Sequence, residues 1–183
     1  MSSLIVKDLC KTYIMNKRQN NVLRNVNMEI KEGEMVAVMG PSGSGKSTLL
    51  YAISGMDRPT AGKVDFFGKD LTNLNASQMS EMRLDEMGFI FQQMYMLKNL
   101  SIYDNIILPA YQSQNGKGKE KREEINNRAK ELMKKLGISE IAENDVNEVS
   151  GGQLQRACIC RSLINKPKMI FADVNCSTLL RCA

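Results

Sequence analysis

The sequence predicts an α/β domain, and three features carry this prediction. An apolar run at 35–39 is typical of a buried strand. A glycine-rich segment at 40–47 follows it directly, and an apolar helix face then begins at Leu49. The chain has 183 residues, of which 43% are apolar, enough for a single core of ordinary size. This order of strand, loop and helix suits an α/β domain.

The other elements of the first half follow from local pattern. Residues 4–9 and 26–30 alternate apolar and polar side chains, which predicts half-exposed antiparallel strands. Residues 31–34 are the turn into the apolar run. A further short strand is expected at 61–68, between glycines, and a helix at 75–87.

The second half is predicted to be mostly helical. A first helix covers 101–108 and stops at Pro109, because proline lacks the N–H that an interior helical position donates. The segment 112–118 is glycine-rich and polar, which predicts a flexible connection. A second helix ends at Gly137 and places its apolar residues on one face, namely Ile125, Ala129, Leu132, Met133 and Leu136.

Residues 40–47 read Gly-Pro-Ser-Gly-Ser-Gly-Lys-Ser and complete the pattern G-x-x-x-x-G-K-[ST]. Closely spaced glycines let successive backbone N–H groups turn inward, and the loop leads into a helix N-terminus of partial positive charge. Lys46 is expected to reach the β- and γ-phosphates, and the Ser47 hydroxyl to coordinate Mg²⁺. The pattern predicts a nucleoside triphosphate site, and a Gly/Ser-rich linker is the alternative.

A second pattern, Ser150-Gly-Gly-Gln153, opens an apolar helix. Ser150 is a good N-cap, and the two glycines leave room for an anion to approach the first N–H groups. Taken alone, the pattern also suits an ordinary capped loop. Its place after the phosphate loop and before the strand-like segment 168–173 favours a second phosphate-binding surface.

With these motifs in this order, residues 4–173 resemble the nucleotide-binding domains of ATP-binding cassette (ABC) proteins. The resemblance identifies 40–47 as Walker A, 150–153 as the signature motif, and 169–173 as the Walker B strand. It identifies 89–92 as the Q-loop strand, with Gln93 as the neighbouring alternative to Gln92. Tyr13 resembles the aromatic residue that stacks on adenine, a contact that suits a flat ring. The implied fold is a P-loop NTPase of ABC type, with an antiparallel β subdomain, an α-helical subdomain at about 95–150, and an incomplete C-terminus.

The resemblance implies a site for ATP and Mg²⁺ that draws on all of these motifs. The implied catalytic residues are Lys46, Gln92 and Asp173, and the implied metal ligands are Ser47, Gln92 and Asp173. The residues implied in nucleotide binding are Tyr13, Gly40, Pro41, Ser42, Gly43, Ser44, Gly45, Lys46, Ser47, Thr48, Ser150, Gly151, Gly152 and Gln153.

Within the family, residues 88–93 and 96–101 resemble the ATPases of bacterial lipoprotein release, macrolide efflux and antimicrobial-peptide export. The implied function is the ATP-binding subunit of a membrane exporter, which couples ATP binding and hydrolysis to transport. The implied partners are a membrane permease and a second cassette, identical or related, that buries two ATP molecules. The cluster of Met94, Met96 and Leu97 is either core packing or part of the groove that receives the permease.

The chain also departs from the family pattern. Val174 occupies the position of the catalytic glutamate, and an isopropyl group neither accepts a proton nor orients water. The sequence contains no histidine, so the switch histidine is missing, and 174–183 form an atypical tail. We expect a truncated cassette that binds Mg-ATP, hydrolyses it slowly or not at all, and associates through unpaired strands. The alternatives are a hydrolysis-deficient regulator, a non-functional fragment, and a soluble ABC ATPase of repair or translation.

Composition limits location and partners. No run approaches the roughly 20 apolar residues that span a bilayer, and the N-terminus lacks a signal pattern. We therefore expect no direct membrane insertion, and a cytoplasmic chain held at the inner face of the cell membrane through the permease. The five cysteines form no C-x-x-C pair, which fits reduced thiols. Glutamates interleave the basic run at 117–122, so no nucleic-acid partner is expected.

Overall fold

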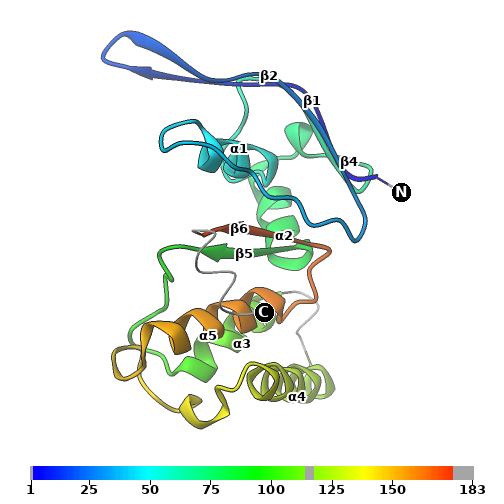
Figure 1. Cartoon of the computed structure of the whole chain (residues 1–183). Helices are drawn as coiled ribbons and strands as arrows, with labels where there is room; N and C mark the ends of the chain where they lie inside the picture. The colour runs from blue at the N-terminus through cyan, green and yellow to red at the C-terminus, as the bar shows by residue number, and fades with distance from the viewer. Residues whose placement is uncertain (1, 114–117, 175–183) are drawn as a thin grey trace. The chain divides into compact units, whose positions relative to one another are not determined.

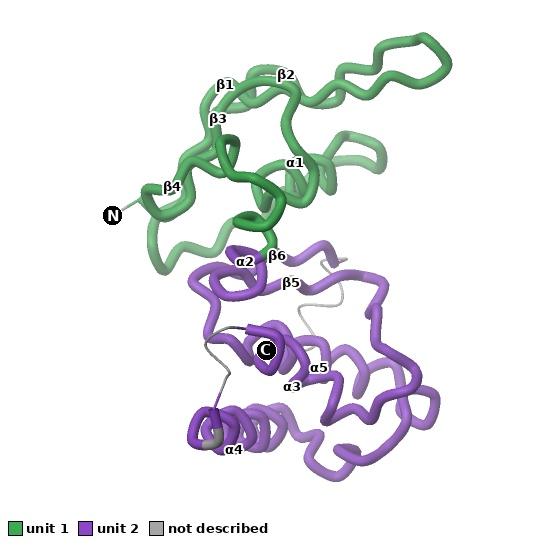
Figure 2. Tube along the Cα trace, turned by 180° about the vertical axis from the view of Figure 1, so that it is seen from behind, with its two compact units in different colours: residues 1–80 green, residues 81–183 purple. Residues whose placement is uncertain are grey.

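The computed structural model describes residues 2–113 and 118–174 of the chain. The chain divides into two compact units, 1–80 and 81–183, which Figure 2 shows in separate colours. Part of the predicted flexible connection, 114–117, and the tail at 175–183 lie outside the described residues. Within the described ranges, no helix combines the length and the apolar character that a membrane span requires.

Unit 1 is built on an antiparallel sheet with the strand order β2-β1-β3-β4. Val6 in β1 pairs with Met28 on one side and with Val64 on the other, so β1 has a neighbour on each side. Alternate residues of β1 and β3 face the core, and Leu4, Val6, Val64 and Phe66 are at most 2% exposed. The predicted antiparallel strands are thereby confirmed. Their bounds are β1 (Ser2–Met15), β2 (Arg18–Lys31), β3 (Ala61–Phe66) and β4 (Lys69–Asp70).

Helix α1 (Lys46–Ile53) contacts β1 and β2 and buries Ala52 and Ile53 (Figure 1). A 3₁₀ turn, η1 (Leu71–Asn73), precedes α2 (Ala76–Glu86). Asn75 and Gln78 fix the start of α2, because each side-chain oxygen accepts the backbone N–H of the other residue, at 2.9 and 3.0 Å. The helix predicted at 75–87 is confirmed.

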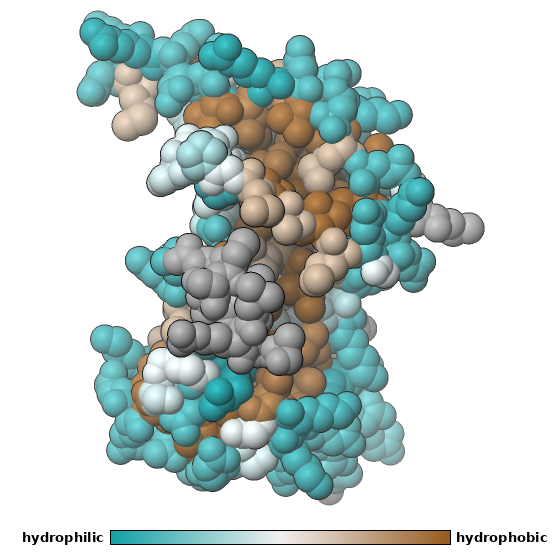
Figure 3. Space-filling model, viewed as in Figure 1, coloured by the Kyte–Doolittle hydropathy of each residue, from teal (hydrophilic) through white to brown (hydrophobic). Residues whose placement is uncertain are grey.

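The apolar run 35–39 does not form the strand that its composition predicts. Met35 and Met39 are 97% and 81% exposed, and neither sheet of the described residues includes the run. A strand is stable where neighbouring strands pair with its N–H and C=O groups, and no strand in either described sheet pairs with this segment. The prediction of a buried strand at 35–39 is therefore wrong. Apolar side chains reach the surface on the face that Figure 3 shows.

Unit 2 contains a two-stranded parallel sheet of β5 (Met87–Phe91) and β6 (Met169–Asp173). Phe89 stands opposite Phe171, and their rings stack at a centroid distance of 5.7 Å. The described part of the unit also contains the helices α3 (Ile102–Gln112), α4 (Lys119–Lys135) and α5 (Gly151–Leu163), with the 3₁₀ turns η3 (Ser139–Ile141) and η4 (Val146–Glu148).

Helices α3, α4 and α5 share one apolar cluster. Helix α4 contributes the predicted face, on which Ile125, Ala129 and Met133 are at most 5% exposed, with Leu132 and Leu136 packed beside them. Gly137, at φ 62°, follows the helix, and its N–H donates to the Lys134 carbonyl. The predicted second helix and its terminator are confirmed.

The predicted helix stop at Pro109 is wrong, because α3 continues through this residue to Gln112. Proline in a helix interior costs about 3 kcal/mol, since it removes one backbone hydrogen bond. Burial of one isoleucine side chain stabilises the fold by roughly 1.5–3 kcal/mol. The apolar face of α3, which includes Ile102, Ile106, Ile107 and Ala110, is at most 6% exposed and therefore outweighs the proline.

Candidate nucleotide-binding site

The phosphate loop leads into α1, whose first helical residue is Lys46. Gly45 is the N-cap with φ 91°, and Gly43 has φ 78°, both in the left-handed region that favours glycine. A Cβ on Gly45 would lie 3.0 Å from Cγ1 of Val22, closer than ordinary packing allows. The loop therefore depends on glycine, and its backbone leads into the N-terminus of a helix, where anions are favoured.

The Lys46 ammonium is held against the start of the same loop. Its Nζ donates to the carbonyl of Gly40 at 2.9 Å and to that of Pro41 at 2.7 Å. An ammonium group has three N–H donors, so these two bonds fix the amine and leave one donor for a further acceptor. A phosphate oxygen bound by the loop is such an acceptor.

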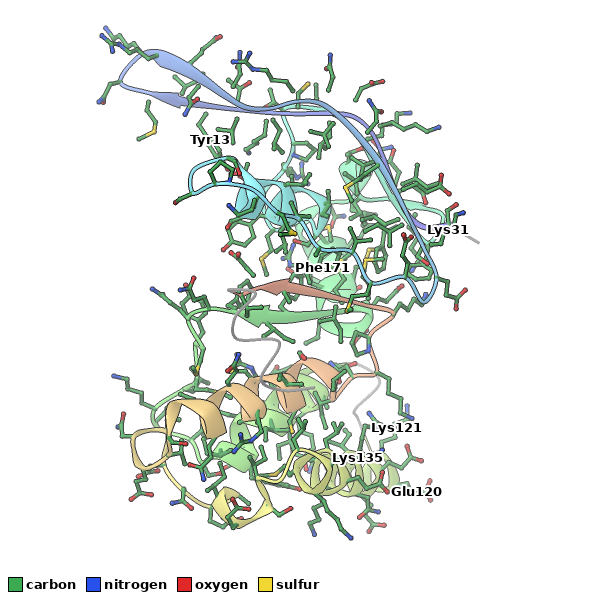
Figure 4. The ribbon with its side chains drawn as sticks, in the orientation of Figure 1. Tyr13, Lys31, Glu120, Lys121, Lys135 and Phe171 are labelled. Atoms are coloured by element: carbon green, nitrogen blue, oxygen red, sulfur yellow. The ribbon has the colours of Figure 1, made fainter. Side chains whose placement is uncertain are left out.

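Tyr13 lies on β1, and Figure 4 labels it on the side of the β1–β2 hairpin that faces α1. Its hydroxyl donates to Oδ2 of Asp57 at 2.6 Å. Lys11, two residues earlier on the same strand, places its Nζ 4.9 Å from the centre of the Tyr13 ring. The same Nζ donates to Oδ1 of Asp57 at 2.5 Å and to the carbonyl of Arg58 at 2.7 Å.

These contacts set the protonation states of the cluster. The hydrogen bond to Asp57, together with burial and the negative charge of Asp57, raises the pKa of Tyr13, and the side chain of Thr48 acts in the opposite direction. Burial by itself raises the pKa of Asp57. Hydrogen bonds from Lys11 and Tyr13 and the charge of Lys11 outweigh that effect and hold the pKa below its ordinary 3.8. At neutral pH Asp57 is therefore a carboxylate and Tyr13 a phenol.

The residues predicted as Q-loop and Walker B lie at the carboxyl ends of the parallel strands. Phe91, the last residue of β5, pairs with Asp173, the last residue of β6. Gln92 and Val174 follow directly, so Gln92 and Asp173 emerge at the same edge of the sheet. This edge is where α/β proteins commonly place their ligands. In the described ranges, histidine, cysteine, aspartate and glutamate form no cluster of three that could hold a metal ion by itself.

Residues 150–153, predicted as the signature motif, form the start of α5. The Ser150 hydroxyl accepts the N–H of Gln153 at 3.3 Å, and the Gln153 side chain accepts the N–H of Ser150 at 2.9 Å. This is a capping box, and the predicted cap at Ser150 is confirmed. Gly151 and Gly152 lie exposed at the helix start, and among the described residues, outside its chain neighbours and the helix backbone, nothing lies within 4 Å of a Cβ built on Gly151.

Helix α5 also holds the segment that follows Gln92. Arg161 donates to the carbonyls of Tyr95 and Met94 at 2.9 and 2.8 Å, and Sγ of Cys158 donates to the Met94 carbonyl at 3.3 Å. Met96 packs against the helix cluster, whereas Leu97 is 47% exposed. The segment thus contributes to the core and to the surface of unit 2.

The cysteine thiols of α5 are buried and uncharged at neutral pH. Burial raises the pKa of Cys160 to about 12. Burial also raises the pKa of Cys158, against the charge of Arg161. Cys10, Cys158 and Cys160 are free thiols, and Cys176 and Cys182 lie outside the described residues.

Two cavities lie elsewhere. One of about 300 Å³ in unit 2 is lined by Asp85, Lys121, Arg128 and Asn165, among others, and one of about 280 Å³ in unit 1 by Gly55, Arg58, Leu71 and Met79, among others. Neither is lined by a predicted site residue, so the candidate site rests on the loop and helix starts.

The predicted site residues divide between the two units. Tyr13 and residues 40–48 belong to unit 1, whereas Gln92, 150–153 and Asp173 belong to unit 2. The sequence reasoning missed Lys11, Asp57 and Arg161. Lys11 carries a weak signal, because residues two apart in a strand share a face. Asp57 carries none, since it lies 44 residues from its partner Tyr13.

Comparison with known proteins agrees with this geometry. The family model for ABC transporters matches residues 23–175. The chain is 40% identical over 173 residues to the lipoprotein-releasing system ATP-binding protein LolD of Wigglesworthia glossinidia brevipalpis. That match covers 94% of this chain and 73% of the relative.

Solved ABC cassettes have the same fold. The dimeric structure of MJ0796, described as a bacterial ABC transporter cassette, has a TM-score of 0.87 at 36% identity and covers 98% of this chain and 79% of its own. A dimer of MJ0796 bound to ADP and Pi, in a post-hydrolysis state, has a TM-score of 0.81 at 35% identity, with 96% and 77% covered. The cbiO1 protein of Clostridium perfringens, part of the transporter complex cbiONQ, has a TM-score of 0.80 at 26% identity, with 98% and 70% covered.

The sequence motifs, the antiparallel sheet beside the phosphate loop, the helical cluster and these matches agree on one fold class. The predicted P-loop NTPase fold of ABC type is confirmed. This chain belongs to the ABC transporter family, as an ATP-binding ATPase subunit.

Proposed function

We propose that this chain binds Mg-ATP as the nucleotide-binding subunit of an ABC exporter. The observation that carries the proposal is the loop at 40–47, which leads into α1 and fixes the Lys46 amine through the Gly40 and Pro41 carbonyls. The phosphates bind this loop, and Tyr13 stacks on the adenine ring. Ser47, Gln92 and Asp173 hold Mg²⁺, with phosphate oxygens completing its shell.

The register of the parallel strands supports the assignment of Gln92 and Asp173. Both emerge at one edge of the β5–β6 sheet, because Phe91 pairs with Asp173. Amide and carboxylate oxygens are hard ligands that suit Mg²⁺.

The proposed partners are a second cassette and a membrane permease. The ABC domain at 1–173 dimerises with an identical or related cassette, so that residues 150–153 of one copy cover the ATP on Walker A of the other. The permease holds the chain at the inner face of the cell membrane and binds the surface around Tyr95 and Leu97, which are 65% and 47% exposed. The match to LolD favours lipoprotein release among the transport classes that the sequence suggested.

The second part of the proposal is that this chain hydrolyses ATP slowly, and it rests on Val174. This residue directly follows Asp173, where the family resemblance puts the catalytic glutamate. Its side chain offers no group to polarise an attacking water, and loss of a general base typically lowers a rate by about 10²–10⁴-fold. A second candidate function follows from this residue, namely a regulator that ATP clamps into a dimer without turnover.

Equilibrium titration of Mg-ATP into the purified chain tests the proposal, with Lys46→Ala as the matched variant. We expect saturable binding that is weakened at least about tenfold in the variant, since the amine makes a charge-assisted contact to phosphate. Circular dichroism of both proteins checks that the variant keeps its fold. Equal binding by the two folded proteins, or no binding by the parent chain, contradicts the proposal.

A further inference from the structure

We propose that Lys11 and Asp57 are positioning residues that fix the Tyr13 ring for the nucleotide base. They set the affinity for the base separately from the affinity for the phosphates. This inference rests on the proposed function, because it takes the Tyr13 ring as the surface on which the base stacks.

The Tyr13 ring is held at both ends. Its Cα belongs to β1 and pairs with Asn20 of β2, and its hydroxyl donates to Oδ2 of Asp57 at 2.6 Å. The other oxygen of Asp57 accepts from Lys11, so the carboxylate is itself fixed. A phenol bound to a charged acceptor loses rotamer freedom before any ligand arrives, and preorganisation of this kind raises affinity.

Asp57 in turn is attached to the phosphate loop through α1. The backbone N–H groups of Met56 and Asp57 donate to the carbonyl of Tyr51 at 2.9 and 3.1 Å. Helix α1 begins at Lys46 and ends at Ile53, a length of about 12 Å at 1.5 Å per residue. The helix therefore carries the phosphate loop at its start and the anchor of Tyr13 just past its end.

Strand β1 is tied to the same connection. The N–H of Thr60 donates to the carbonyl of Cys10 at 2.8 Å, and the N–H of Thr12 donates to Oγ1 of Thr60 at 3.0 Å. The segment 56–60 thus bonds both to α1 and to β1 within unit 1. The distance from Tyr13 to the phosphate loop is fixed by these bonds, which suits a ligand with a flat base at one end and phosphates at the other.

Lys11 also decides which face of the ring is used. Its ammonium lies 4.9 Å from the ring centre, and its side chain is only 11% exposed. One face of Tyr13 is therefore covered by a cation, and the base stacks on the opposite face. A Lys11–Asp57 pair with a purely structural role would leave nucleotide preference unchanged and would affect stability alone.

Binding of ATP and of inorganic triphosphate to the purified chain separates the two roles. The main variant is Tyr13→Phe, which keeps the ring and removes the hydroxyl that donates to Asp57 and interacts with Thr48. Asp57→Ala removes the anchor from the other side. The matched control is Tyr111→Phe. Tyr111 lies on α3 in unit 2, and the variant removes a hydroxyl that donates to Oδ1 of Asn126 at 2.9 Å. Thermal unfolding of each variant checks that it remains folded.

We expect Tyr13→Phe to weaken ATP binding about fivefold, the value of one ordinary hydrogen bond, with triphosphate binding unchanged. Asp57→Ala should weaken ATP at least as much, and Tyr111→Phe should weaken neither ligand. Unchanged ATP binding in folded Tyr13→Phe overturns the inference, as does an equal loss for ATP and triphosphate. If the parent chain binds neither ligand, the proposed function itself fails. If the parent chain binds ATP, the affinities of the variants decide the inference.

Discussion

The starts of α1 and α5, both assigned to phosphate binding by the sequence, are built in opposite ways. Helix α1 begins after Gly45, which has φ 91° and no side chain to cap the helix. Helix α5 begins after Ser150, whose hydroxyl and backbone N–H both bond with Gln153. The first start depends on a backbone conformation that suits glycine, whereas the second is stabilised by its own side chains.

This difference indicates different roles for the two helix starts. A glycine-led start leaves capping of its N–H groups to the backbone, to solvent or to a ligand, and an anion is favoured there. A capping box stabilises its helix in the absence of ligand and leaves exposed glycines at the surface. We therefore expect α1 to hold the resident nucleotide, and α5 to be a stable surface that meets a phosphate from another subunit.

The largest expected effect on stability comes from replacing one glycine with alanine at the start of α1 and at the start of α5. Gly45→Ala should lower the free energy of unfolding by about 1–2 kcal/mol, because an alanine in the left-handed region is strained. Its Cβ would also lie 3.0 Å from Val22. Gly151→Ala is the matched variant, and it should change stability by no more than about 0.5 kcal/mol, since its methyl group meets no atom within 4 Å.

Chemical denaturation of the two alanine variants, together with titration of ATP, measures this contrast. Gly45→Ala should also weaken ATP binding, because the loop must shift to relieve the strain. If folded Gly45→Ala has the stability and ATP affinity of the parent chain, the proposed difference between the starts of α1 and α5 is wrong.

A smaller effect is expected when the cap of α5 is removed. Ser150→Ala should lower the free energy of unfolding by about 1 kcal/mol, whereas Ser150→Gly should lower it by only a few tenths. ATP binding to the single chain should be unchanged in both, because the capping bonds join Ser150 only to Gln153 within the start of α5. Equal denaturation midpoints for Ser150→Ala and the parent chain would show that the capping box does not stabilise α5.

The smallest expected effect is a pH dependence from Asp57. The pKa of this residue is lower in the folded chain than its ordinary 3.8, so its contribution to stability is present above the ordinary pKa. That contribution is lost as the pH falls through the folded pKa. The difference in unfolding free energy between the parent chain and Asp57→Asn should therefore narrow between pH 7 and about pH 3. A constant difference over this range would mean that Asp57 is not held by Lys11 and Tyr13.

Much of the fold followed from the sequence because it depends on local patterns. Apolar spacing identified the buried face of α4, and the Ser-x-x-Gln spacing identified the cap of α5. The predicted helix stop at Pro109 was wrong because the proline penalty is local, whereas the burial that offsets it comes from packing of α3 against α4 and α5. The predicted strand at 35–39 was wrong because apolar composition does not supply the neighbouring strand with which a β-strand must pair.

The candidate site followed from the sequence only in part. Contiguous motifs define the loop at 40–47 and the helix start at 150–153, since their function depends on local backbone geometry. Lys11 and Asp57 were missed because the fold brings them together from segments 46 residues apart. Arg161 was missed for the same reason, since it holds carbonyls 66 and 67 residues away.

Release of γ-phosphate from Mg-ATP, measured beside ATP binding on the purified chain, tests the central claim most directly. The account predicts saturable binding through the loop at 40–47, with phosphate release no faster than in Lys46→Ala, because Val174 supplies no general base. Turnover on the order of 1 s⁻¹ or faster, lost in Lys46→Ala, would contradict the role assigned to Val174.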